Sequence, residues 1–172
     1  PSRGLGDVYK RQYMHQLLFD HNASWNADNI HIPQGHVDDL EREAGRYENQ
    51  LKQIGQPDIQ LLGIGENGHI GFNEPGTSFE SETRVVDLTD STINANSVHF
   101  DHIDDVPKQA VSMGLNSIMR AKRIILLAFG ERKRDAIHQL LNGETTESLP
   151  ASILHQHPNV EIIVDDTIFK HL

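Results

Sequence analysis

The sequence contains no cysteine and no run of apolar residues long enough to cross a membrane. The absence of cysteine excludes a disulfide framework and metal sites built on thiolates. Because we find neither a membrane span nor a secretory signal, we expect a cytoplasmic protein with no membrane partner. Basic residues are also few: 15 Lys and Arg stand against 25 Asp and Glu, which gives a formal net charge of -10. This balance argues against nucleic acid as a partner, although a small anionic substrate needs only a few local cations.

The first residues differ in character from the rest of the chain. Residues 7–12, DVYKRQ, match the translation of a common transposon adapter used in preparing DNA libraries, and no initiator Met precedes them. We therefore predict that residues 1–11 are a non-native, adapter-derived segment, with a natural short basic turn as the alternative. Residues 12–172 are predicted to be the C-terminal part of a single domain that begins upstream in the natural protein.

Two kinds of apolar spacing alternate along the chain. Residues 40–54 repeat apolar side chains at intervals of three and four, which predicts a helix capped by Asp38 and ended by Gly55. Residues 59–64 and 123–129 are mostly apolar runs, typical of buried strands in a parallel sheet. The other predicted elements are strands over 29–33, 84–88 and 161–164, a short strand or turn followed by a helix within 107–121, and helices over 14–19 and 132–141, the last with Ala136, Ile137, Leu140 and Leu141 facing inward. The alternation predicts an α/β fold with a mostly parallel sheet, in which ligands bind at the C-terminal ends of strands.

The loop after the first apolar run carries a glycine pattern that is typical of dinucleotide sites. Residues 63–68, GIGENG, match G-x-G-x-x-G, and the acidic Asp87 follows about twenty positions later. Such a site requires that the third glycine open a helix whose N-terminus meets the pyrophosphate. Residues 69–76, HIGFNEPG, contain two glycines and a proline that prevent a regular helix. We therefore exclude a nicotinamide cofactor and predict that the protein uses no cofactor.

The remaining interpretation is a tight loop at a strand end that carries His69, Asn67, Asn73 and Glu74. A histidine can move protons to and from sugar oxygens near neutral pH. A nearby carboxylate can orient its ring and stabilise the imidazolium form. The spacing alone leaves a solvated surface loop equally open.

Residues 61–76, LLGIGENGHIGFNEPG, resemble the signature of the glucosamine-6-phosphate deaminase family. The likeness extends from the region of Tyr13 to the C-terminus and includes Thr83-Arg-Val, Ala95-Asn-Ser, residues 105–110, residues 130–133, residues 149–152 and His157-Pro. The resemblance implies a three-layer, modified Rossmann-like α/β fold of the deaminase and phosphogluconolactonase superfamily, incomplete at the N-terminus. It also implies a chemistry that needs no metal.

By this resemblance, His69 is the acid–base group that opens the pyranose ring, Glu74 assists it, and Asn67 completes the catalytic group. Many family members carry Asp at the position of Asn67. Because Asn cannot take a negative charge, any ion-pair role at this position is lost. We interpret the difference as variation within the family rather than as inactivation.

Four further residues are predicted to bind substrate. The resemblance assigns the phosphate to Lys133, and a helix N-terminus beside it also favours an anion. A solvated surface lysine is the alternative. Gly65 and Gly68 let the backbone approach a ligand without a Cβ clash, and Arg84 is the fourth predicted contact.

The chain departs from the family pattern in two places. Where the family has an arginine that contacts phosphate, this chain has Val98, followed by His99. A valine donates no hydrogen bond, so phosphate affinity is expected to fall unless His99 or Arg84 compensates. The family's phosphate loop and the Asp that moves a proton between C2 and C1 both lie upstream of Tyr13. The missing Asp leads to the expectation that this chain by itself is inactive.

The implied activity is that of a hydrolase that also isomerises its substrate, in the catabolism of amino sugars such as N-acetylglucosamine. It would convert glucosamine 6-phosphate and water into fructose 6-phosphate and ammonia. A 6-phosphogluconolactonase-like hydrolase and an inert sugar-phosphate-binding fragment are the alternatives. Lactone hydrolysis does not require Glu74, which places the first alternative lower. The expected partner is a small sugar phosphate, and assembly into a homo-oligomer is left open.

Two histidine pairs have spacings that also occur in metal sites. They are His155 with His157, and His99 with His102. Neither pair has a third convergent ligand in the sequence, so we interpret them as polar loop residues and predict no metal site.

Overall fold

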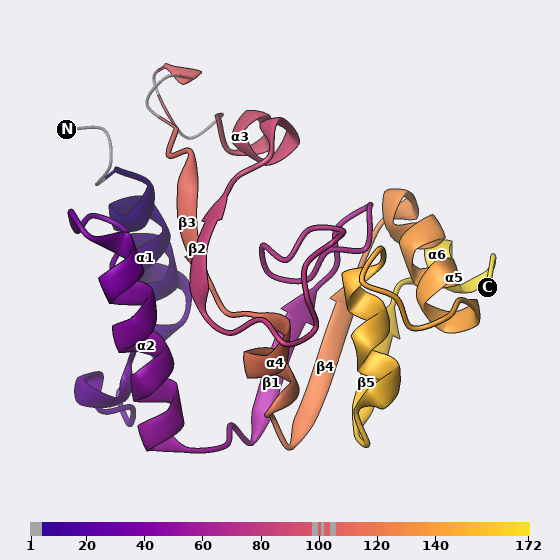
Figure 1. The fold of residues 1–172 in the computed structure, drawn as a ribbon, viewed down its shortest axis with the longest axis horizontal. Coiled ribbons are helices and arrows are strands. Elements are labelled where there is room, and N and C mark those ends of the chain that lie inside the picture. The colour runs from indigo at the N-terminus through magenta and orange to yellow at the C-terminus, as the bar shows by residue number, and fades with distance from the viewer. Residues whose placement is uncertain (1–4, 98–99, 101, 104–105) are drawn as a thin grey trace. The chain divides into compact units, whose positions relative to one another are not determined.

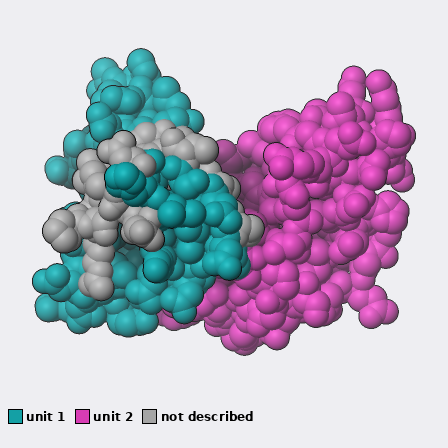
Figure 2. Space-filling view, turned by 90° about the horizontal axis from the view of Figure 1, so that it is seen from above, with its two compact units in different colours: residues 1–47, 85–111 teal, residues 48–84, 112–172 magenta. Residues whose placement is uncertain are grey.

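The computed structural model describes residues 5–97, 100, 102–103 and 106–172, and it divides into two compact units. Figure 1 labels the helices and strands, and Figure 2 colours the two units. The first unit contains residues 1–47 and 85–111, and the second contains residues 48–84 and 112–172. Within the described ranges, every helix is too short or too polar to cross a lipid bilayer.

The first unit holds the N-terminal helices and most of a small sheet. Its elements are α1 (Leu5–Leu17), η2 (Phe19–His21), η3 (Ala27–Asn29), the first half of α2 (Leu40–Ile54), β2 (Arg84–Asp87), α3 (Asp90–Asn96) and β3 (Gln109–Ser112). β2 and β3 pair with each other in a separate two-stranded sheet. α1 includes part of the predicted adapter segment, whose foreign origin stays a prediction.

Two local predictions in this unit are wrong. The strand expected over residues 29–33 does not form, since Ala27–Asn29 make a 3-10 turn and the residues after it are irregular. Just after this stretch, the Gln34 N–H donates to the Glu43 carboxylate of α2 at 2.8 Å and not to a neighbouring strand. The N-cap of α2 is Asp39 instead of Asp38, because Asp39 Oδ1 accepts from the Arg42 N–H at 2.9 Å.

The second unit holds the parallel sheet. Its elements in chain order are β1 (Ile59–Gly63), α4 (Leu115–Met119), β4 (Arg123–Ala128), η6 (Glu131–Lys133), α5 (Arg134–Asn142), η7 (Pro150–Gln156), β5 (Val160–Val164) and α6 (Asp166–Phe169). The strands lie in the order β1-β4-β5, and both pairings are parallel. The predicted α/β class with a mostly parallel sheet is therefore confirmed.

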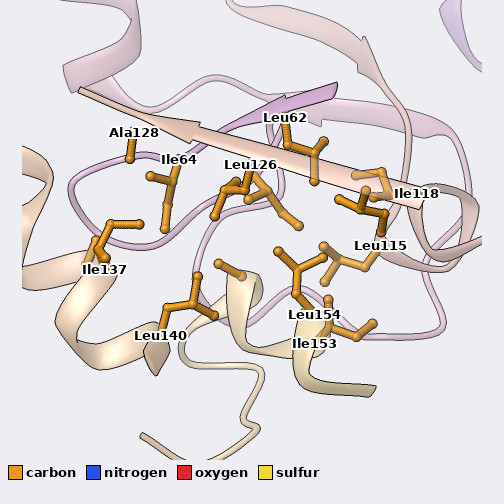
Figure 3. Packing of buried hydrophobic residues seen from close by; sticks show 14 of the residues in the cluster. Leu62, Ile64, Leu115, Ile118, Leu126, Ala128, Ile137, Leu140, Ile153 and Leu154 are labelled. Carbon is orange, nitrogen blue, oxygen red and sulfur yellow. The ribbon is translucent and has the colours of Figure 1, made fainter. Parts of the chain in front are cut away.

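One face of this sheet forms the hydrophobic core. Leu62 on β1 pairs in register with Leu126 on β4, which pairs with Ile162 on β5, and side chains in register share one face of the sheet. Figure 3 shows the helical residues that gather around Leu126. They come from α4, α5 and η7, and the buried ones include Leu115, Ile118, Ile137, Leu140, Ile153 and Leu154.

The opposite face of the sheet is open in this chain. Ile59 and Leu61 on β1 are 56% and 60% exposed, so the expectation that residues 59–64 are buried on both faces is wrong. Ile163 on β5 is also exposed and belongs to the same face. On α5, Leu141 was expected to face inward but is 48% exposed, because consecutive helical residues are about 100° apart and Leu141 lies at the edge of the buried face formed by Ala136, Ile137 and Leu140.

A buried carboxylate ties the end of α2 to the rest of the second unit. Glu48 is 4% exposed and accepts hydrogen bonds from the Thr83 N–H at 3.1 Å, the Thr83 hydroxyl at 2.6 Å and the Ser117 hydroxyl at 2.8 Å. It also pairs with the guanidinium of Arg120. Burial raises the pKa of Glu48, but these hydrogen bonds outweigh it and lower the pKa from 4.5 to about 2.

We expect Glu48→Gln to destabilise the protein by about 3 kcal/mol at pH 7, because a group with a lowered pKa stabilises the fold in its ionised form. That contribution is complete above the unfolded pKa of 4.5 and is lost as the pH falls toward about 2. Urea unfolding followed by circular dichroism at pH 7 and pH 3 measures the difference. Glu41→Gln, at an exposed position of the same helix, is the control and should change stability by less than about 0.5 kcal/mol. An equal effect of Glu48→Gln at both pH values would contradict the prediction.

Candidate active site

The candidate site is built on the loop that leaves the C-terminal end of β1. The loop folds back at once, since the Gly65 N–H donates to the His69 carbonyl at 2.8 Å and the Gly68 N–H donates to the Gly65 carbonyl at 3.1 Å. Ile70 and Asn73 then form an isolated antiparallel bridge. No helix occurs between β1 and β2 in this described stretch, so the third glycine opens no helix, as the sequence predicted.

Gly65 is required because the His69 ring lies directly against it. A Cβ atom on Gly65 would lie 2.2 Å from Cε1 and Nδ1 of His69. Gly68 is buried with φ at +82°, and a Cβ atom there would lie 2.1 Å from Cδ1 of Leu149. Both glycines therefore shape the turn that seats His69. A direct contact of either glycine with substrate stays a prediction.

His69, Asn67 and Glu74 meet on this turn. Asn67 Oδ1 accepts from Nδ1 of His69 at 2.7 Å and from the His69 backbone N–H at 3.2 Å. Asn67 Nδ2 donates to Glu74 Oε2 at 2.7 Å, and Glu74 Oε1 lies 3.5 Å from His69 Nδ1. The His69 and Glu74 side chains are 29% and 25% exposed, so a small ligand can reach both.

This network determines which nitrogen of His69 can exchange a proton. Because Asn67 uses its amide N–H to reach Glu74, only its oxygen faces Nδ1 of His69. Nδ1 must then carry the hydrogen, and the lone pair of the neutral ring lies on Nε2. Nε2 is therefore the atom able to accept a proton, and the Glu74 carboxylate lies near enough to stabilise the imidazolium that results.

Arg84 lies against the far side of the same turn. The buried Asn73 donates from Nδ2 to the carbonyls of Ile70 and Met113, both at 2.9 Å, and its Oδ1 accepts from Arg84 at 2.8 Å. Burial lowers the pKa of Arg84. The guanidinium thus stabilises the turn through Asn73, and its predicted contact with substrate stays a prediction.

The second loop at this edge of the sheet follows β4 and carries Lys133. Gly63 on β1 pairs with Leu127 on β4 in a parallel register, so the loops that follow both strands leave the same edge. An exposed ion pair of 3.4 Å between Arg132 and Glu66 joins the two loops. Lys133 stands at the start of α5, and among the described residues its ammonium has no hydrogen-bond or ion-pair partner.

Asp165 belongs to this edge of the sheet and was missed by the sequence analysis. It follows β5, and its Oδ2 accepts from the Gly130 N–H at 2.7 Å. Its Oδ1 accepts from the Thr167 hydroxyl at 2.6 Å and from the Ile168 N–H at 3.2 Å. The hydrogen bonds from Thr167 and Gly130 lower the pKa of Asp165. An Asp between a strand and a helix signals an N-cap in the sequence, but no sequence pattern pairs it with Gly130.

The remaining predicted residues lie elsewhere. Val98 and His99 are outside the described residues, so the expected weakening of phosphate binding stays a prediction. His157 donates from Nε2 to the Ala121 carbonyl at 2.7 Å and His155 hydrogen bonds to the Leu140 carbonyl, so both rings serve the packing of loops. In the part of the chain that the structure describes, no three His, Asp or Glu side chains are grouped as metal ligands.

Two curated proteins with high sequence identity to this chain share the same name. The glucosamine-6-phosphate deaminase of Staphylococcus haemolyticus strain JCSC1435 is 97% identical over 160 residues, which cover 93% of this chain and 66% of that protein. The protein of the same name from Staphylococcus aureus strain bovine RF122 / ET3-1 is 62% identical over 154 residues, which cover 90% of this chain and 61% of that protein. The chain thus spans 61% to 66% of the length of these curated relatives.

The fold has a similarly close counterpart. The solved structure of a monomeric glucosamine-6-phosphate deaminase matches with a TM-score of 0.86 and 47% identity, over 92% of this chain and 65% of that one. This match, like those in sequence, extends beyond the turn to nearly all of the chain.

These similarities overturn one expectation of the sequence analysis, namely that this chain is inactive. The expectation rested on an Asp that the family carries upstream of Tyr13. A protein 97% identical over 160 residues is nevertheless named a deaminase, so the comparison gives no support to a loss of activity. The predicted hydrolase class fits the relatives, and the predicted inactivity is withdrawn.

A family model also matches most of the chain and agrees with the names of the relatives. That model is described as glucosamine-6-phosphate isomerases/6-phosphogluconolactonase, and it matches residues 9–163. The chain belongs to the glucosamine-6-phosphate isomerase/6-phosphogluconolactonase family.

Proposed function

We propose that the protein is a glucosamine-6-phosphate deaminase that converts glucosamine 6-phosphate and water into fructose 6-phosphate and ammonia. The observation that carries the proposal is the contact of His69 with Asn67 and Glu74, on a turn that shares one sheet edge with the Lys133 loop. The names of the 97% and 62% identical relatives support it.

His69 acts first, on the closed sugar ring. Its Nε2 accepts the proton of the anomeric hydroxyl and returns a proton to the ring oxygen, which opens the pyranose. During this exchange the ring of His69 is transiently positive. Asn67 holds the ring in place through Nδ1, and the Glu74 carboxylate at 3.5 Å stabilises the positive form.

Lys133 binds the phosphate of the substrate. Its ammonium has no partner among the described side chains, and it stands at the N-terminus of the nine-residue helix α5. Helix N–H groups and a lysine ammonium both attract a dianion, so the two effects add at this position. Anchoring the phosphate at the β4 loop leaves the sugar ring directed toward the neighbouring β1 loop, where His69 lies.

The neighbouring activity in the family, 6-phosphogluconolactone hydrolysis, is less well supported. Opening an ester-like lactone requires a base that activates water, but it gives no role to a carboxylate that is bound to that base through Asn67. Here Glu74 is held by Asn67 at 2.7 Å and is accessible at 25% exposure. Both activities act on a sugar phosphate, which fits the cytoplasmic location expected from the sequence, because a charged phosphate does not cross lipid unaided.

The first test measures ammonia release from glucosamine 6-phosphate by the whole protein, with hydrolysis of 6-phosphogluconolactone assayed in parallel. We expect ammonia release, and we expect His69→Gln to lower kcat by about 10²- to 10⁴-fold because glutamine cannot transfer the proton. His138→Gln, at an exposed position of α5, is the control and should leave kcat unchanged. Lactone hydrolysis without ammonia release would refute the proposed function.

Lys133→Gln should raise the KM for glucosamine 6-phosphate about tenfold or more, with a smaller change in kcat, because a charged hydrogen bond to phosphate is lost. Lys122→Gln removes the same charge at the opposite end of β4 and should leave KM unchanged. Steady-state kinetics of both variants measure the difference. If the two variants raise KM equally, Lys133 exerts only a general charge effect and the phosphate assignment fails.

Gly65→Ala should lower kcat about 100-fold, because the added methyl group occupies the place of the His69 ring and displaces it. Gly63→Ala is the matched control, since a Cβ atom at Gly63 meets nothing within 4 Å. Thermal unfolding of both variants separates loss of the site from loss of the fold. Normal activity of Gly65→Ala would show that the position of His69 against Gly65 is not needed.

A further inference from the structure

The carboxylate of Asp165 joins two segments that follow neighbouring strands. The last residue pair of the β4–β5 ladder is Ala128 with Val164, so the backbone pairing stops one residue before Asp165. Beyond that point, Asp165 Oδ2 accepts the Gly130 N–H at 2.7 Å. The side chain thus continues the connection between the two strand ends after the backbone ladder has ended.

Gly130 passes this restraint on to the loop that carries Lys133. The Gly130 N–H is held by Asp165, and its carbonyl accepts from the Lys133 N–H at 3.0 Å. The two bonds fix the peptide groups on both sides of Gly130, and with them the start of α5. The Lys133 side chain therefore leaves a backbone whose position is set by a residue on the next strand.

We propose that Asp165 is a positioning residue for phosphate binding, acting on Lys133 through Gly130. The inference rests on the proposed function, because it takes Lys133 as the phosphate ligand. Asp165 itself carries a negative charge and would repel the phosphate, so its contribution is to the geometry of the loop and not to the contact.

A simple helix cap would not explain this geometry. Capping α6 requires one side-chain oxygen, and Oδ1 does this by accepting from the Ile168 N–H at 3.2 Å. The cap does not need Oδ2, and this second oxygen accepts the hydrogen bond from the Gly130 N–H. Variants that keep one capping oxygen but lose the second acceptor therefore separate the two roles.

Asp165→Asn and Asp165→Ser provide this separation, since both residues are good N-caps and neither retains the second carboxylate oxygen. In the whole protein we expect each to raise the KM for glucosamine 6-phosphate about tenfold while kcat changes less than about twofold. Amide hydrogen exchange should become faster at residues 130–133 and stay unchanged in α6. Asp166→Asn removes the same charge one residue away, at an exposed position, and should change neither quantity.

The outcomes are decisive in both directions. An unchanged KM in both Asp165 variants overturns the proposal, and so does a rise in KM that Asp166→Asn reproduces or that accompanies loss of protection in α6. If the wild-type protein releases no ammonia, the proposed function fails, but the positioning role of Asp165 can still be tested. The affinity for inorganic phosphate, measured by titration at the Lys133 amide, then tests that role. Weaker phosphate binding in the Asp165 variants alone supports positioning, whereas equal binding, or none in the wild type, overturns it.

Discussion

The parallel pairing of β1 with β4 is the constraint on which the candidate site depends. Each strand is short and is followed by a loop that carries polar residues, with the His69 turn on one loop and Lys133 on the other. Because Gly63 and Leu127 lie opposite each other, the two loops begin at the same level of the sheet. The core on one face of the sheet fixes that level through Leu62 and Leu126, which are 7% and 0% exposed. The site is therefore positioned by apolar packing at some distance from its chemistry.

Asn67 gives a physical account of a departure from the family pattern that the sequence left unexplained. A carboxylate at this position would be placed beside the carboxylate of Glu74, and like charges at hydrogen-bond distance repel each other. An amide avoids this conflict, because it presents an acceptor to His69 and a donor to Glu74. The loss of a charge at residue 67 is thus compensated by a bridge that a carboxylate could make only when protonated.

Much of the fold could be predicted from the sequence where a local pattern and the tertiary structure agree. The apolar run over 123–129 became β4, and the glycine-rich loop formed no helix. The grouping of His69, Asn67 and Glu74 was implied by the family resemblance and not by spacing, and their side chains are in contact in the structure. The sequence could not show that Leu61 is exposed, because the same apolar residue type occurs in strands whose second face is buried and in strands whose second face is exposed. It also could not show the bond between Asp165 and Gly130, because 35 positions separate the two residues and only strand order brings them together.

The open face of the parallel sheet has a practical consequence. Ile59 and Leu61 on β1 and Ile163 on β5 are 56%, 60% and 39% exposed there, and the half-buried Ile125 and Leu127 of β4 lie between them. Exposed apolar side chains grouped on one face of a sheet favour self-association in concentrated solution. Dilute samples and added arginine or mild detergent are therefore the conditions under which this chain is best handled, and light scattering should accompany every measurement made on it.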